Sequence, residues 1–188
     1  LEKRRNSQVA FLNVNRTNYQ QVFEEAKLDI AIGSFGEVPK LYGIEHLYTE
    51  QHVCLLDSSV LGVELPMSLE TFVSVDHALV SPNGSLKTGV DIKLAELGYA
   101  RKVAIASSNF LTVKRLISGR KLLCIVPKLV ARTDSNMENS LIAVAPPIEV
   151  PDFDIQLVYR KGKQLDDKNI HLRKTISQAV EEVTGRGE

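Results

Sequence analysis

The chain has 188 residues, which is the size of one domain or of two small lobes that share a sheet. Lysine and arginine together number 23, as do aspartate and glutamate, so the chain has no excess positive charge to neutralise nucleic-acid phosphates. With 44% hydrophobic and 24% charged residues, its composition is that of a globular protein. These values argue against a disordered chain, a collagen-like chain and a stand-alone nucleic-acid-binding protein.

No segment has the pattern of a membrane anchor or an export signal. The longest apolar runs, at 53–56 and 122–127, are far shorter than the roughly 20 residues of a membrane helix. Residues 1–5 are basic, but no apolar stretch follows them. We therefore expect a cytoplasmic protein that does not contact a membrane. Cys54 and Cys124 each lie in an apolar run outside any CxxC or Cys/His cluster, and they are predicted to be buried, reduced thiols.

Strand and helix patterns alternate in the first half of the chain. Thr17 followed by Gln20 is typical of a helix start. Residues 28–33 form a β-branched apolar run closed by glycine, which is typical of a buried parallel strand. The segments that follow are predicted strands at 43–48, 52–57 and 77–81, a helix at 68–73 and a turn at 82–84.

In the second half, polar residues mark the helix starts. Thr88 can cap a helix that Gly98 ends, and Asn109 with the preceding serines can cap a helix that Gly119 ends. The remaining predictions are strands at 102–106, 122–126, 141–144 and 153–159, a short helix from Pro127, and a last helix from Asp167 with an apolar stripe at Ile170, Ile176, Val180 and Val183. The alternation predicts an α/β fold with largely parallel sheets, in which the strands near 52 and 153 cross between two lobes.

The sequence lacks the common catalytic and nucleotide-binding signatures. GxSxG, P-loop, HExxH and GxGxxG motifs are absent. The four histidines, His46, His52, His77 and His171, are scattered without the spacing of metal ligands. We therefore predict no catalytic residue, no cofactor and no metal site.

One candidate for contact with a small ligand is the segment Ser107, Ser108, Asn109 and Phe110. It joins a predicted strand end to a predicted helix start, where free backbone N–H groups and small hydroxyls can hold a carboxylate or another anion. Plain helix capping is the alternative interpretation of the same residues.

A second candidate is the segment Gly33, Ser34 and Phe35. It follows the strand at 28–33, at the carboxyl end where open α/β sheets bind their ligands. The ring of Phe35 could stack on a ligand or belong to the core, and the sequence leaves both alternatives open.

In order and spacing, several of these segments resemble the effector-binding domain of LysR-type transcriptional regulators. The sequence LDIAIG at 28–33 is similar to that family's (L/V)D(L/I)A(I/L)G strand. The other segments that carry the resemblance are 47–56 (LYTE, then HVCLL), 68–72 (SLETF), 89–98 (GVD, then LG) and 122–131 (LLCIVPKLVA). Residues 167–173 are most similar to the branch that senses aromatic compounds, which includes the nodulation regulators.

The resemblance implies two Rossmann-like lobes of periplasmic-binding-protein type, with two crossover segments and a ligand cleft at the hinge. Residues 1–51 with 151–188 would form lobe I, and residues 52–150 would form lobe II. Lobe I would bring Gly33, Ser34 and Phe35 to the cleft. The residues that lobe II would bring are Asn83, Gly84, Ser107, Ser108, Asn109 and Phe110.

The resemblance also implies a role and partners. The domain would be a non-enzymatic sensor that binds a small aromatic or carboxylate-bearing inducer and forms a homodimer or tetramer through helices on the lobe flanks. DNA would be bound only by an N-terminal helix-turn-helix domain, which lies outside these residues, as do the first strand and most of the first helix of lobe I.

Two alternatives from other classes stay open. A two-lobed small-molecule enzyme would need a base beside one of the polar candidates Ser34, Asn83, Ser108 and Asn109, and the sequence shows none. A cytosolic solute-binding protein is the second alternative.

Overall fold

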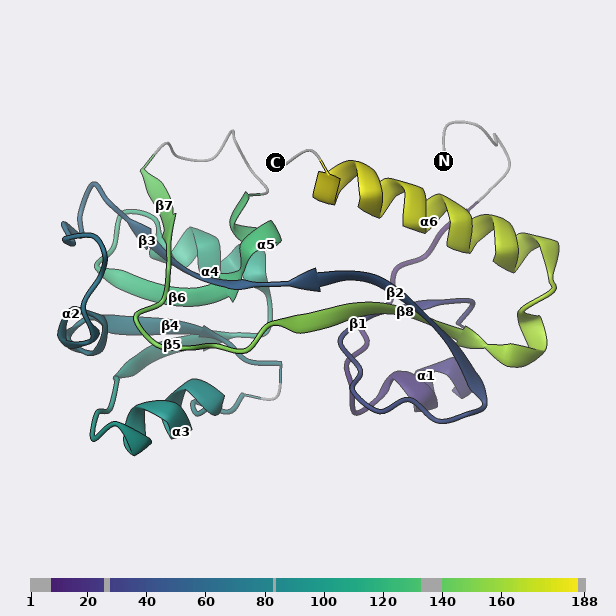
Figure 1. Ribbon diagram of the computed structural model, residues 1–188, viewed down its shortest axis with the longest axis horizontal. Helices are drawn as coiled ribbons and strands as arrows, with labels where there is room; N and C mark the ends of the chain where they lie inside the picture. The colour runs from purple at the N-terminus through teal and green to yellow at the C-terminus, as the bar shows by residue number, and fades with distance from the viewer. Residues whose placement is uncertain (1–7, 26–27, 83, 133–139, 186–188) are drawn as a thin grey trace. The chain divides into compact units, whose positions relative to one another are not determined.

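The computed structural model describes residues 8–25, 28–82, 84–132 and 140–185 (Figure 1). Its contacts divide the chain into two compact units, one formed by Leu1–Tyr48 with Asp154–Glu188 and the other by Thr49–Phe153. The lobe boundaries expected from the sequence lie three residues away from these, at 51 and 151 instead of 48 and 154. Within the described ranges, no helix combines the length and the apolar character needed to cross a membrane.

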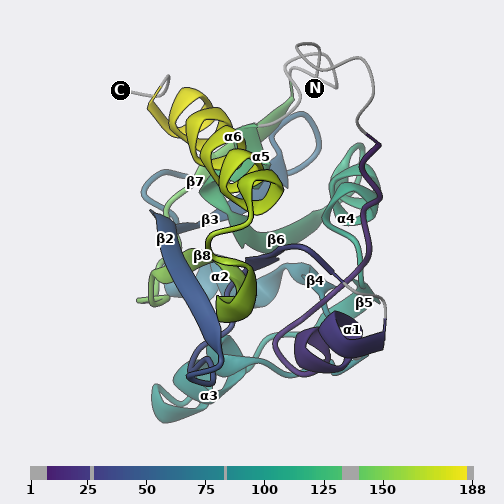
Figure 2. The same ribbon diagram turned by 90° about the vertical axis from the view of Figure 1, so that its right-hand side faces the viewer.

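The first unit is built on a three-stranded sheet in the order β1 (Ala31–Gly33), β8 (Phe153–Arg160), β2 (Tyr42–Glu50). Helix α1 (Tyr19–Glu25) and helix α6 (Asp167–Gly185) lie on opposite sides of this sheet (Figures 1 and 2). A 3-10 turn, η1 (Lys161–Lys163), leads from β8 toward α6.

The expectation of a parallel strand at 28–33 is wrong, because strand β1 is shorter and antiparallel. Only the last three of these residues are extended, and they pair antiparallel to β8, with Ala31 opposite Val158. The carbonyl of Asp29 is bound instead by the side-chain amide of Asn169 from α6, at 3.3 Å. This carbonyl therefore bonds to a helix side chain rather than to a neighbouring strand.

The core of the first unit is a cluster of aromatic rings between α1 and the sheet. Tyr19 lies 4.6 Å from Phe35 and 5.8 Å from Tyr42, measured between ring centroids, and Phe23 lies 5.2 Å from Tyr42. All four rings are buried. Such ring pairs contribute packing energy beyond the area they bury, so four aromatic residues can form a core under a small sheet.

In the described part of the second unit, a five-stranded sheet in the order β5-β4-β6-β3-β7 is accompanied by four helices. Its elements in chain order are β3 (His52–Asp57), α2 (Leu69–Ser74), β4 (Asp76–Val80), α3 (Gly89–Glu96), β5 (Val103–Ser107), α4 (Phe110–Ile117), β6 (Leu122–Pro127), α5 (Lys128–Arg132) and β7 (Leu141–Val144). The expected elements are therefore present, except that Pro127 ends β6 instead of starting α5.

The sheet of the second unit is mixed. Strand β4 runs parallel to β5 and β6, whereas β3 runs antiparallel to β6 and β7. The expectation of a largely parallel sheet is wrong for β3 and β7, because β3 enters the unit from β2 and β7 leads out of it. Neither strand therefore completes a helical crossover of the kind that makes neighbouring strands parallel.

Hydrophobic side chains cover both faces of this sheet. Successive residues of β3 alternate between the faces, as strand geometry requires. Cys54 and Leu56 pack with Phe72 of α2 and Leu94 of α3, while Leu55 packs on the other face against α4. The second unit therefore has a core on each side of its sheet.

Candidate ligand-binding site

Strands β4 and β5 bring two of the predicted ligand segments together. Val80 lies opposite Ser107 in the parallel ladder, and the N–H of Ser81 donates to the carbonyl of Ser107 at 2.8 Å. The turn after β4 and the segment 107–110 after β5 consequently share the carboxyl edge of the sheet. We call this place the β4/β5 edge. Carboxyl edges of parallel strands are where open α/β sheets bind ligands.

The turn after β4 contains two of the predicted residues. Gly84 has a φ of +76°, a left-handed conformation that glycine adopts without steric cost. Its N–H donates to the carbonyl of Ser81 at 3.4 Å, which folds the chain back over the strand end. Asn83 lies outside the described residues.

The segment after β5 forms the start of α4. The side-chain oxygen of Asn109 accepts from the N–H groups of Leu111 at 2.8 Å and Thr112 at 3.2 Å, so helix capping accounts for this side chain. The hydroxyl of Ser107 accepts from the N–H of Asn109 at 3.3 Å. Ser108 is exposed, and the N–H of Phe110 donates to none of the described residues.

The β4/β5 edge combines polar and apolar groups. Phe110 is 36% exposed, and Ser108, two residues before it, is exposed as well. Of the first three N–H groups of α4, that of Phe110 is not taken by the Asn109 cap. A helix N-terminus favours an anion, and an exposed ring offers contact to an apolar body. A small molecule with a carboxylate and an aromatic part would match both features.

The third predicted segment lies in the first unit. The ring of Phe35 is 6% exposed and packs against Tyr19, so it belongs to the aromatic core, which is one of the two alternatives left open by the sequence. A Cβ atom at Gly33 would stand 3.2 Å from the tip of this ring, so a larger residue there would crowd Phe35. Ser34 between them is exposed at the end of β1.

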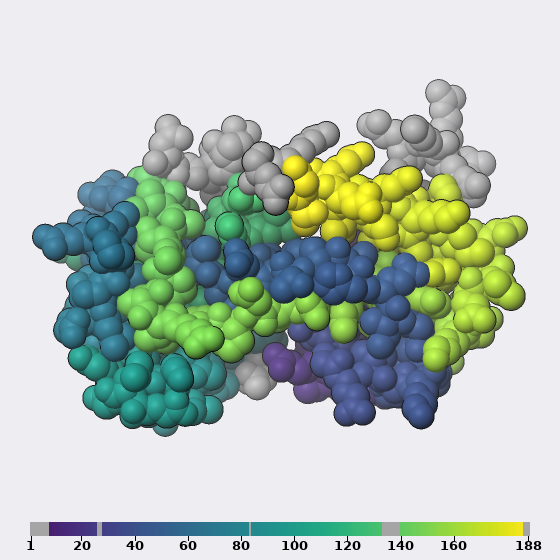
Figure 3. Space-filling model, viewed as in Figure 1, coloured from purple at the N-terminus to yellow at the C-terminus, as the bar shows by residue number. Residues whose placement is uncertain are grey.

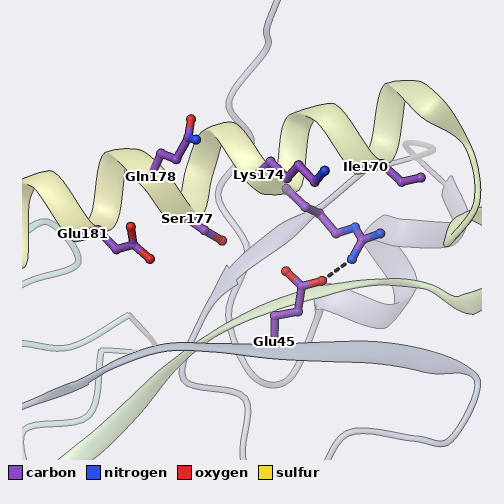
Figure 4. Close-up of a pocket in the computed structure, with 7 residues that line it drawn as sticks. Glu45, Ile170, Lys174, Ser177, Gln178 and Glu181 are labelled. Carbon is purple, nitrogen blue, oxygen red and sulfur yellow. Dashed lines mark hydrogen bonds and ion pairs between the residues drawn. The ribbon is translucent and has the colours of Figure 1, made fainter.

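A groove of about 400 Å³ runs along α6 in the first unit. Its lining residues are Glu45, Ile170, Arg173, Lys174, Ser177, Gln178 and Glu181. Helix α6 lies at the surface of its unit (Figure 3), and Ser177 and Glu181 point from it toward the strands while Gln178 points away (Figure 4). No local sequence pattern indicates this groove, because Glu45 and Arg173 are far apart in the chain.

One cation that lines the groove, Arg173, is already neutralised. Arg173 forms an ion pair with Glu45, and its guanidinium carbon lies 4.2 Å from the centre of the Tyr159 ring. It also donates to the side chain of Asn169 at 2.9 Å and to the carbonyl of Gln164 at 3.1 Å. Arg173 therefore fastens α6 to the sheet.

Nearly the whole chain matches one known protein family. The family described as "LysR substrate binding domain" matches residues 2–181. The chain belongs to this family. The family and the α/β fold of periplasmic-binding-protein type expected from the sequence are thus confirmed.

Relatives and solved structures agree with this assignment. The LysR domain is 28% identical over 158 residues to the HTH-type transcriptional regulator SyrM 1 of Sinorhizobium fredii (strain NBRC 101917 / NGR234), covering 84% of this chain and 46% of that protein. It also matches the regulatory domain of MexT, a transcriptional activator in Pseudomonas aeruginosa, with a TM-score of 0.69 and 23% identity over 84% of this chain and 76% of that one.

A further structure, HinK, a LysR family transcriptional regulator from Pseudomonas aeruginosa, has a TM-score of 0.70 at 14% identity and covers 90% of this chain and 59% of that one. At these identities, the two structures show a shared fold. The chain spans about half the length of the curated relatives it matches.

The two cysteines of this LysR domain lie on neighbouring strands but on opposite faces of the sheet. Leu55 is opposite Cys124 and Cys54 is opposite Ile125, so the two thiols point apart. Burial raises the pKa of each thiol to about 12. Both are therefore suited to packing rather than to forming a disulfide with each other or to reacting as thiolates.

Metal-binding residues do not gather in the part of the chain that the structure describes. No three or more His, Cys, Asp or Glu side chains lie close enough there to hold a metal ion. The chemistry that the β4/β5 edge offers is binding through N–H groups, hydroxyls and a ring.

Proposed function

We propose that this chain is the effector-sensing domain of a LysR-type transcriptional regulator, and that its β4/β5 edge binds a small aromatic or carboxylate-bearing effector. The observation that carries the proposal is the meeting of the turn at Gly84 with the helix start at Ser107–Phe110. Because an effector can shift an equilibrium only by binding one state better than the other, the edge would act by favouring one arrangement of the domain. That Gly33 and Ser34 also contact the effector stays a prediction.

The family match supports a non-enzymatic role over the two-lobed enzyme and the solute-binding protein. Effector binding is the role of this family. The similarity to SyrM 1 supports a cytoplasmic regulator whose DNA contacts are made by a helix-turn-helix domain outside this chain. We further propose a homodimer or tetramer formed through helices on the flanks of the units. None of these proposals requires a cofactor.

A ligand screen tests the proposal. The chain is mixed with aromatic carboxylates, beginning with salicylate and benzoate, and with amino acids and sugars, and both thermal unfolding and product formation are followed. We expect at least one aromatic carboxylate to raise the melting temperature in a concentration-dependent way without being converted, because only the folded state binds it. Conversion of a compound to product would contradict the sensor role, as would the absence of any stabilising compound in the aromatic carboxylate set.

A matched pair of variants locates the site. Phe110→Ala removes the ring at the β4/β5 edge, and we expect it to weaken binding of the stabilising compound about tenfold, which corresponds to about 1.4 kcal/mol. Leu111→Ala is the control, since Leu111 is exposed on the same helix one position further along. Equal affinities for the two variants, measured by isothermal titration, would place the site elsewhere.

A further inference from the structure

The first unit contains a buried acceptor atom that lacks a partner. Among the residues that the structure describes, no group forms a hydrogen bond to the side-chain oxygen Oε1 of Gln156, although this oxygen is buried. Gln156 as a whole is only partly buried, so the residue lies near the surface of its unit. Most buried side-chain oxygens in folded proteins accept a hydrogen bond, because burial without one costs free energy.

The position of Gln156 in the sheet accounts for the missing partner. Gln156 lies in β8 directly opposite Gly33, the last residue of β1. Val158, two positions further along β8, packs in the aromatic cluster, so strand alternation places Gln156 on the same face of the sheet. Its cross-strand neighbour on that face is therefore a glycine, which has no side chain to donate a hydrogen bond.

The same place was predicted from the sequence to contact a ligand. Gly33 and Ser34 were chosen because they follow a strand, and Ser34 is exposed at the end of β1. The unpaired oxygen of Gln156 is a separate observation, made on a different strand, that points to the same end of β1. Two independent features of the first unit thus coincide there.

The chemistry of an amide oxygen defines what it can bind. The oxygen only accepts, so its partner must carry an O–H or N–H group, which neither a carboxylate nor an unsubstituted ring supplies. The last side-chain torsion of glutamine is broad, so the amide can turn toward a ligand. Because the oxygen gives up no hydrogen bond when it turns, a new bond to a ligand is not offset by a lost one.

We propose that Gln156 is a specificity-determining residue of this domain: its side-chain oxygen accepts a hydrogen bond from a hydroxyl or amino group on the ring of an aromatic carboxylate effector. This inference rests on the proposed function, because it adds a contact in the first unit to those predicted for Gly33 and Ser34. It narrows the proposed effector class to aromatic carboxylates whose ring also carries a hydrogen-bond donor.

Isothermal titration with matched probes tests the donor preference. The probes are benzoate, 3-hydroxybenzoate, 4-hydroxybenzoate and 3-aminobenzoate, which share a carboxylate and differ in the ring donor. We expect the parent chain to bind at least one hydroxyl or amino compound about tenfold more tightly than benzoate. Gln156→Met keeps the length of the side chain without its amide, and it should reduce this ratio to within about twofold of one.

Gln178→Met is the matched control for the titration. Gln178 belongs to the same unit, is exposed and points away from the strands (Figure 4). Its replacement should leave the tenfold preference intact. A preference that survives in Gln156→Met, or that is lost equally in both variants, would overturn the assignment.

Gln156→Glu separates the acceptor oxygen from the shape of the side chain. It keeps an acceptor, and since all the probes carry the same carboxylate, repulsion by the new charge cancels in the ratio of their affinities. We expect a preference of at least fivefold to remain. Loss of the preference in Gln156→Glu as complete as in Gln156→Met would overturn the proposal, because shape alone would then account for it.

Thermal unfolding of the ligand-free chain gives a readout that does not depend on binding. Gln156→Met removes the unpaired oxygen, so we expect it to raise the melting temperature by about 2–4 °C, whereas Gln178→Met should leave it unchanged. A lower melting temperature for Gln156→Met would show that the oxygen has a partner in the folded chain, such as an ordered water, and would overturn the proposal.

The outcomes for the parent chain distinguish this inference from the proposed function. Binding of benzoate with no preference for the hydroxyl and amino compounds would overturn the role of Gln156 and leave the proposed function standing. Binding of none of the four probes would count against the proposed function and would overturn the role of Gln156 with it.

Discussion

Two arginines, one in each unit, hold a helix in place, and their surroundings differ. Arg101 in the second unit is 1% exposed and pairs with Asp91 at the start of α3. Arg173 in the first unit is 14% exposed, its partner Glu45 is 33% exposed, and the pair borders an open groove. Water can replace part of what Arg173 loses, but it cannot reach the guanidinium of Arg101 in the folded protein. The same residue type is therefore expected to contribute differently to the two units.

Replacement of each arginine by methionine tests this difference. Arg101→Met leaves Asp91 without its cation and is expected to lower the free energy of unfolding by about 3–5 kcal/mol, as for other broken buried pairs. Arg173→Met loses its hydrogen bonds to charged and polar groups at a partly wet site, so about 1–2 kcal/mol is expected. Urea unfolding at neutral pH measures both values.

Lys102→Met is the control for these two variants. It removes an exposed ion pair with Asp76 and should lower the free energy of unfolding by less than about 1 kcal/mol. A larger loss for Arg173→Met than for Arg101→Met would show that burial does not set the contribution of these residues.

Acid should destabilise the second unit through His77. Its pKa of about 4 lies below its ordinary value of 6.5, so the unfolded chain binds more protons than the folded chain between these pH values. Stability is therefore full above pH 6.5 and falls as the pH drops toward 4, by about 3 kcal/mol for this pKa difference. Urea unfolding at a series of pH values measures the slope.

The imidazole of His77 is hydrogen-bonded to the carbonyl of Phe72 at 2.8 Å. His77→Gln keeps a donor for this carbonyl but cannot titrate, so it should flatten the pH dependence of the free energy of unfolding. His46→Gln is the matched control, because His46 is exposed in the first unit. An unchanged slope in His77→Gln would mean that another group is responsible for the loss of stability in acid.

The smallest effect is expected from the thiols. Cys54 and Cys124 are fully buried, and the pKa of each is raised to about 12, so neither forms a reactive thiolate near neutral pH. A thiol reagent such as DTNB should leave the folded chain unmodified and react with two thiols after denaturation. Rapid reaction of the native chain would contradict the packing described for β3 and β6.

Local signals account for what the sequence predicted well. The caps at Thr88 and Asn109 act on residues two or three positions away, so their residue types alone identify the helix starts. The meeting of the turn after β4 with the segment after β5 follows from parallel pairing, since the carboxyl ends of such strands share an edge.

Contacts between distant residues explain what the sequence did not predict. The apolar stripe expected on the last helix is only partly buried, since Val183 is 51% exposed. The polar residue Asn169 is buried instead, and its side-chain amide donates to the carbonyl of Asp29. The ring of Phe35 is in the core because Tyr19 and Tyr42 surround it, and nothing in the sequence near Phe35 shows this. The pairing of Arg173 with Glu45 is equally invisible in a single sequence.

The central claim is that the effector binds at the β4/β5 edge of the second unit rather than in the groove along α6. Hydrogen exchange of the chain with and without a stabilising aromatic carboxylate tests it most directly. We predict slower exchange at 84–86 and 108–112, with no change at 170–181. Protection at 170–181 with none at the β4/β5 edge would contradict the account.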